Sequence, residues 1–134
     1  MKSIDFFEVA RVLLACGDAE SMQRSSVSRA YYGVLHACRE ALPEAYAPTK
    51  AQLNAAGSHK ATIAAMQQWG ASSGKGRAEA QRIARSIVQL KRLRVCADYE
   101  LGREWKINAQ LVLRDAIAIA KLANVARENF DKQE

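Results

Sequence analysis

Helix-breaking residues are scarce in this sequence, which has two prolines and seven glycines among 134 residues. A β-sandwich or barrel needs many tight turns, and most such turns need glycine, proline or another turn-forming residue. Between the breaks the chain is rich in alanine, leucine, arginine and glutamine, which are strong helix formers. No segment shows a convincing alternation of apolar and polar residues. We therefore predict an all-α fold, a bundle of four to five helices.

Apolar residues at helical spacing predict where these helices lie. The expected helices cover about 4–16, 19–42, 58–70, 77–99 and 107–130. Ser3 and Ser58 are candidate N-caps, because serine side chains accept hydrogen bonds from free helix N–H groups. Residues 43–57 are predicted to form a loop, residues near 70–76 a flexible connector, and residues near 131–134 a charged tail. The length fits a single helical domain over residues 1–134.

Composition limits the class of protein. The chain is 49% hydrophobic and 25% charged, which is typical of globular proteins. Its three cysteines, Cys16, Cys38 and Cys96, are an odd number without a C-x-x-C pair, so we interpret them as buried free thiols in a reducing compartment. The N-terminus has mixed charge, and no apolar run approaches the roughly 18–20 residues that a membrane span needs. We expect a cytoplasmic protein with no signal peptide and no membrane association.

Positive charge is concentrated in the middle of the chain. The net charge is +6, and residues 49–103 carry ten basic and three acidic residues. Such a surface favours partners that carry phosphate. Within this region Arg77, Arg82, Arg85 and Arg92 are candidate nucleic-acid-binding residues on the helix predicted over 77–99. The alternative is an ordinary solvated helix face.

The helix predicted over 19–42 has two distinct faces. One face is apolar and consists of Val27, Ala30, Tyr31, Val34, Cys38 and Leu42. A polar stripe lies apart from it, within about 60° of Arg29 around the helix axis, and consists of Ser25, Arg29, Tyr32, His36 and Glu40. A histidine can move a proton near neutral pH, and an arginine can hold phosphate oxygens. The stripe is therefore a candidate site for cleaving RNA without a metal ion, with Arg29 and His36 as catalytic residues. The alternative is a solvent-facing stripe on which His36 and Glu40 pair.

Arg94 lies on the apolar side of its helix, within about 40° of Ile83, Ile87 and Leu90. Asp98 is one turn further on, where its carboxylate can neutralise a buried guanidinium. Two interpretations stay open: a buried Arg94–Asp98 pair that holds helices together, or a site residue between this helix and the helix of Arg29.

These stripes resemble motifs of the HEPN superfamily (higher eukaryotes and prokaryotes nucleotide-binding). The resemblance lies in Ser28-Arg29-Ala30-Tyr31-Tyr32-Gly33-Val34-Leu35-His36 and Leu93-Arg94-Val95-Cys96-Ala97-Asp98-Tyr99, with Ser58-His59-Lys60 as a weaker third match. It spans about residues 5–130 and is similar to the small prokaryotic branch of the superfamily. It implies a HEPN-like helical bundle, usually a homodimer.

Many HEPN proteins are metal-independent ribonucleases with an Arg-x(4–6)-His motif, often toxins paired with a minimal nucleotidyltransferase antitoxin. Arg29 and His36 fit that spacing, and the resemblance gives Tyr32, Arg94, Asp98 and Tyr99 supporting roles. In the well-characterised ribonuclease branches the motif lies late in the domain, where this chain has Tyr99 in place of the histidine. Non-catalytic members bind nucleotides or dock partner proteins, which is the alternative function. The two histidines and dispersed cysteines do not form a metal-binding pattern, so we expect no metal and no cofactor.

Overall fold

The computed structural model describes residues 1–54 and 56–132, and over these residues it is helical without strands. The prediction of an all-α fold is confirmed. The helices are α1 (Ser3–Ala15), α2 (Glu20–Ala41), α3 (Lys50–Asn54), α4 (Ser58–Ala71), α5 (Arg77–Tyr99) and α6 (Ala109–Asp131). Five of them correspond to predicted helices. Two residues of the predicted charged tail, 133 and 134, lie outside the described residues.

The short helix α3 lies inside the predicted loop over 43–57, so that prediction was wrong there. Its first turn is closed by a capping box, in which the Gln52 backbone N–H donates to Thr49 Oγ1 at 3.2 Å and the Thr49 N–H donates to Gln52 Oε1 at 2.8 Å. Thr-x-x-Gln is a sequence signature of helix starts. The signature stands at residues 49–52 and would have predicted α3.

The predicted N-caps are shifted by one residue. Ser3 and Ser58 are the first helical residues, and Lys2 and Gly57 occupy the cap positions. The hydroxyl of Ser3 donates to Glu40 Oε2 at 3.0 Å instead of capping its own helix. Gly57 has φ +91°, a left-handed conformation that glycine adopts without steric cost.

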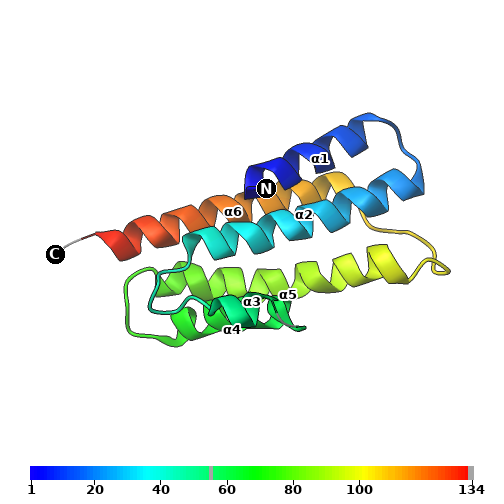
Figure 1. Ribbon diagram of the computed structural model, residues 1–134. Coiled ribbons are helices and arrows are strands. Elements are labelled where there is room, and N and C mark those ends of the chain that lie inside the picture. The colour runs from blue at the N-terminus through cyan, green and yellow to red at the C-terminus, as the bar shows by residue number, and fades with distance from the viewer. Residues whose placement is uncertain (55, 133–134) are drawn as a thin grey trace.

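The helices form two layers, with α1, α2 and α6 in one layer and α4 and α5 in the other, where α3 lies beside α4 (Figure 1). Helix α2 contacts α1, α6, α5 and α4, so it lies at the centre of the bundle. All six residues of its predicted apolar face are buried. Burying a large aliphatic or aromatic side chain contributes about 1.5–3 kcal/mol, so this face anchors α2 between the layers.

Glycines allow two close helix contacts. A Cβ on Gly33 of α2 would lie 2.5 Å from the Phe7 ring of α1, and one on Gly70 of α4 would lie 2.8 Å from the Gln81 backbone of α5. Gly70 thus belongs to a helix interface, and residues 72–76 form the turn between α4 and α5. That turn is tied down by Trp69, whose indole N–H donates to the Lys75 carbonyl at 3.0 Å.

The interpretation of all three cysteines as buried was wrong for Cys16. Cys38 is buried in the core and Cys96 is half-buried, but Cys16 is exposed at the C-terminal cap of α1. The chain leaves the bundle at that point towards Gly17. None of the helices over the described residues combines the length and the hydropathy that crossing a membrane requires.

Candidate functional site

The predicted polar stripe of α2 lies between α1 on one side and α4 and α5 on the other. Among the described residues, α1 contacts α2 and α6 but not α4 or α5. The middle of the stripe is therefore only partly covered: Arg29, Tyr32 and His36 are half-buried, whereas Ser25 and Glu40 at its ends are exposed.

Aromatic rings hold the middle of this stripe in place. Phe6 of α1 stacks on His36 with ring centres 4.6 Å apart, and on Tyr32 at 6.2 Å. The guanidinium carbon of Arg29 lies 4.9 Å from the centre of the Tyr32 ring, within cation–π distance. Arg29 makes no hydrogen bond or ion pair with the residues that the structure describes. Its N–H groups are therefore free to bind an anion.

Phe6 of α1 belongs to the site, although it was not among the predicted site residues. It is buried, with 8% of its surface exposed. The sequence indicates the position of Phe6 only indirectly. Its neighbour Phe7 packs against Gly33, and this contact sets the height of α1 along α2.

Arg94 of α5 approaches Tyr32 from the side of α5. Its Nη2 donates to the Tyr32 hydroxyl at 2.8 Å, and its Nε lies 2.8 Å from Asp98 Oδ2. The Nε–H points off the line to that oxygen, so the contact is an ion pair without an aligned hydrogen bond. Ser28 Oγ donates to the same Asp98 oxygen at 3.1 Å. The predicted Arg94–Asp98 pair is present, and it joins α5 to α2.

The charge of Arg94 is well compensated. Burial lowers the pKa of this guanidinium, but Tyr32, Asp98 and Tyr99 together raise it above its usual value. The Tyr99 hydroxyl is 3.5 Å from Nη2, a weak contact. The structure is thus compatible with both interpretations of Arg94. Arg94 and Asp98 join α5 to α2, and Arg94 also borders Tyr32 in the candidate site.

His59 at the start of α4 completes the cluster. Its ring centre lies 5.5 Å from that of Tyr32, and its Nδ1 is hydrogen-bonded to the Tyr31 hydroxyl at 3.2 Å. Burial raises the pKa of Tyr31 to about 12, so this phenol stays protonated. In the sequence, His59 belongs only to the weak motif match Ser58-His59-Lys60. The fold brings it beside α2 because α4 contacts both α5 and α2.

The surroundings of both histidines lower their pKa values. Burial lowers the pKa of His36, the Arg39 cation lowers it further, and Glu40 acts in the opposite direction. Burial also lowers the pKa of His59, followed by Arg94 and Arg39. Because the usual histidine pKa is 6.5, both rings are mostly neutral at pH 7 and can accept a proton.

The alternative of a His36–Glu40 pair is wrong. Glu40 binds the start of α1 instead, where its Oε1 accepts from the Ser3 backbone N–H at 2.8 Å. A carboxylate is favourable at a helix N-terminus, because it satisfies free N–H groups and the positive end of the helix dipole. His36 is therefore left with ring stacking as its contact to α1.

The four predicted nucleic-acid-binding arginines are all exposed. Arg85 and Arg92 line a groove of about 460 Å³ between α5 and α4, with Gln67 and Gly70 on the α4 side. Arg77 begins α5 and Arg82 points to another side of that helix. The fold thus brings Arg85 and Arg92 to one groove, whereas Arg77 and Arg82 are not among the residues that line it.

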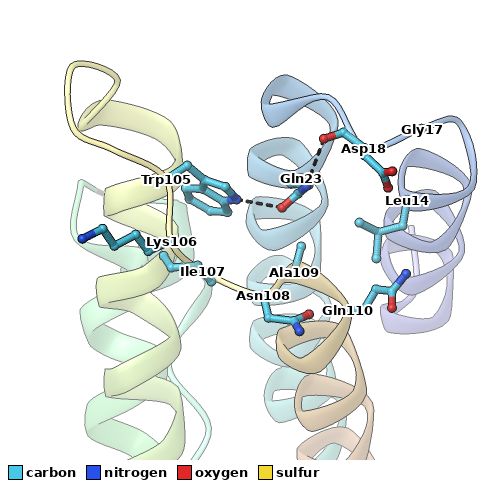
Figure 2. Close-up of a pocket in the computed structure, with 10 residues that line it drawn as sticks. All are labelled: Leu14, Gly17, Asp18, Gln23, Trp105, Lys106, Ile107, Asn108, Ala109 and Gln110. Atoms are coloured by element: carbon cyan, nitrogen blue, oxygen red, sulfur yellow. Dashed lines mark hydrogen bonds between the residues drawn. The ribbon is translucent and has the colours of Figure 1, made fainter.

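A separate cavity of about 490 Å³ lies where α2 and α6 begin (Figure 2). Two of its polar side chains are linked: the Trp105 indole N–H donates to Gln23 Oε1 at 2.9 Å, and Gln23 Nε2 donates to the Asp18 carbonyl at 3.0 Å. The residues that line it include none of the predicted site residues. We therefore take the cluster around Tyr32 as the candidate site.

Comparison with protein-family models, curated proteins and solved structures finds no match to this chain. Over the described part of the chain, no three histidine, cysteine, aspartate or glutamate side chains come together as metal ligands. The candidate functional groups of the site are its arginines, histidines and tyrosines.

Proposed function

We propose that this protein is an RNA-directed protein of the HEPN type, which cleaves RNA without a metal ion at the surface formed by Arg29, Tyr32 and His36. One observation carries this proposal. A guanidinium with no partner among the described residues is held on the Tyr32 ring, on the same helix face as a histidine whose pKa is lowered. A phosphate-binding group and a proton acceptor thus lie on one face of α2, about two helical turns apart and both against the Phe6 ring.

RNA carries its own nucleophile, the 2′-hydroxyl. In the proposed reaction a neutral histidine removes the 2′-hydroxyl proton, the 2′-oxygen attacks the adjacent phosphorus, and the bond from phosphorus to the 5′-oxygen breaks. The leaving oxygen takes up a proton, and the products are a 2′,3′-cyclic phosphate and a 5′-hydroxyl. Arg29 would stabilise the extra negative charge on the phosphate in the transition state.

Two proton transfers are needed, and one neutral ring can serve both. We assign them to His36, which stacks on Phe6: its ring takes up the 2′-hydroxyl proton and then returns it to the leaving 5′-oxygen, while His59 lies against Tyr32 at the edge of the site. Arg94 and Asp98 are assigned a positioning role, because both are engaged with each other and Arg94 binds the Tyr32 hydroxyl.

The proposal is tested with a fluorescent RNA oligonucleotide in the presence of EDTA. We expect the wild type to cleave it, and Arg29→Ala and His36→Ala to cleave at least about 100-fold more slowly, as is usual when a general acid–base group is lost. Arg114→Ala, which removes an exposed arginine on α6, is the matched control and should cleave like the wild type. RNA with 2′-deoxy substitution should resist cleavage.

The outcomes separate the candidate functions. Equal cleavage by wild type, Arg29→Ala and His36→Ala would reject the catalytic assignment. RNA or nucleotide binding that depends on Arg29, without cleavage, would favour the non-catalytic alternative, a nucleotide-binding or partner-docking module. The fact that Arg94 is engaged by Asp98, with Tyr99 in the position of the family histidine, is the observation that favours this alternative. Growth inhibition by the wild type, but not by His36→Ala, would support a toxin.

A further inference from the structure

Tyr99, the last residue of α5, carries an aromatic ring on the surface. It is 68% exposed, whereas the other tyrosines, all within the described residues, are buried or half-buried. Its neighbours Val95 and Leu101 are also exposed. An exposed aromatic ring among apolar side chains offers a flat contact surface that a solvated helix end does not need.

The Tyr99 ring is supported from within the candidate site. The guanidinium carbon of Arg94 lies 5.3 Å from its centre and equally 5.3 Å from the centre of the Tyr32 ring. Because Asp98 and the Tyr32 hydroxyl hold Arg94, the cation cannot swing away. Arg29 lies over the same Tyr32 ring. Tyr99 and Arg29 therefore border one cluster of side chains.

Tyr99 also continues a row of residues along α5. Arg85, Arg92 and Tyr99 are spaced seven residues apart, so they lie on nearly one helix face, with about 10 Å between successive members. The first two line the groove between α5 and α4. Figure 1 shows that α5 extends beyond the start of α4, and Tyr99 at the end of α5 is exposed. Cations that follow a strand, together with an aromatic ring on which a base stacks, are the usual parts of a single-strand binding surface.

We propose that the Tyr99 ring is a stacking platform for an unpaired base, and that the substrate of the site is therefore single-stranded RNA. This inference rests on the proposed function. The phosphate backbone would follow Arg85 and Arg92 along α5, and the base at the end of this path would lie on Tyr99, next to the nucleotide whose phosphate binds Arg29. A base within a duplex has both faces covered by its neighbours and cannot stack in this way.

The test measures binding of a labelled single-stranded octanucleotide whose 2′-oxygens are methylated, so that it cannot be cleaved. We expect Tyr99→Ala to weaken binding by about tenfold, because stacking of one base contributes at least this much in single-strand complexes. Tyr99→Phe should bind like the wild type, since the ring and not the hydroxyl makes the contact. Leu101→Ala, which shortens an equally exposed but non-aromatic neighbour, is the matched control and should also bind normally.

Two further measurements make the proposal falsifiable. A hairpin with the same sequence in its stem should bind more weakly than the single strand. A single strand in which the stacked base is replaced by an abasic nucleotide should bind wild type and Tyr99→Ala with equal affinity. Equal binding of Tyr99→Ala and wild type, together with loss of binding in Arg29→Ala, would overturn the stacking platform and leave the proposed function standing. Equal affinity for hairpin and single strand would overturn the substrate class. Absence of RNA binding by the wild type would overturn both proposals.

Discussion

The arginines on either side of Tyr32 differ in what their charge can do. Arg94 is 14% exposed and engaged by Asp98 and the Tyr32 hydroxyl, whereas Arg29 lies over the rings of Phe6 and Tyr32 and has neither a hydrogen bond nor an ion pair among the described residues. A guanidinium that already has a carboxylate partner gains little from a phosphate, because the incoming anion must compete with that carboxylate. Arg29 is therefore the residue of this pair that can bind a ligand strongly.

The histidines predict how stability depends on pH. The pKa values of His36 and His59 are lowered by folding, so the unfolded chain binds protons more readily than the folded one. The contribution of the two neutral rings to the free energy of unfolding is fully present above the unfolded pKa of 6.5. This contribution is lost as the pH falls below that value. We expect a loss below about 1 kcal/mol for each ring between pH 7.5 and 5.5, because solvent screens these half-exposed groups.

Urea unfolding at these two pH values measures this effect, and His36→Gln and His59→Gln provide the comparison. Each variant should lose less stability than the wild type on acidification, because glutamine does not titrate. A wild type that becomes more stable on acidification would contradict the direction of both shifts.

Among the elements, the C-terminal end of α5 depends on a residue that the sequence analysis did not single out. Arg24 of α2 is 5% exposed and donates to the backbone carbonyls of Cys96, Ala97, Glu100 and Arg103. The last carbonyls of a helix have no partner within the helix, so these bonds cap α5. Arg127 of α6 caps α2 in the same way, by donating to the carbonyls of Ala41 and Leu42.

We expect Arg24→Ala to destabilise the fold by about 3 kcal/mol, because it leaves buried carbonyls without donors. Arg24→Lys should recover part of this loss, since one ammonium cannot reach all four carbonyls. Thermal unfolding followed by circular dichroism measures both, with Arg114→Ala as an exposed control. If Arg24→Ala unfolded no more easily than this control, the cap would have no part in stability.

At the scale of the whole molecule, charge is distributed unevenly over the two layers. Residues 49–103, which form α3, α4 and α5, carry ten basic and three acidic side chains, and the net charge of the chain is +6. The other layer contributes Arg29 from α2. Any RNA bound to the proposed site would therefore contact cations from both layers.

The salt dependence of RNA binding tests this arrangement. If Arg29, Arg85 and Arg92 each bind a phosphate, the logarithm of affinity should fall with the logarithm of salt concentration with a slope of about −2 for a single strand. The double variant Arg85→Ala with Arg92→Ala should reduce the slope to about −0.7, whereas Arg114→Ala should leave it unchanged. A wild-type affinity that is insensitive to salt would exclude phosphate contacts by these arginines.

Much of the fold was predictable from the sequence, and less of the candidate site. Periodicity predicted five helices and the buried face of α2, because one buried residue in each turn is a local pattern. The same projection placed Arg29, Tyr32 and His36 on one stripe and Asp98 within reach of Arg94, because residues three, four and seven apart share a helix face. The helix α3 was missed although its Thr-x-x-Gln signature is present in the sequence.

The polar stripe of α2, with Arg29 and His36 on it, was determined by the sequence alone, since it depends only on helical geometry. Its surroundings were decided by the tertiary structure. Phe6, His59 and Arg94 come from three other helices, and only packing sets their distances to Tyr32 and His36. The physical reason is that periodicity tells which side chains share a face, whereas the height and rotation of one helix against another follow from contacts such as Phe7 on Gly33.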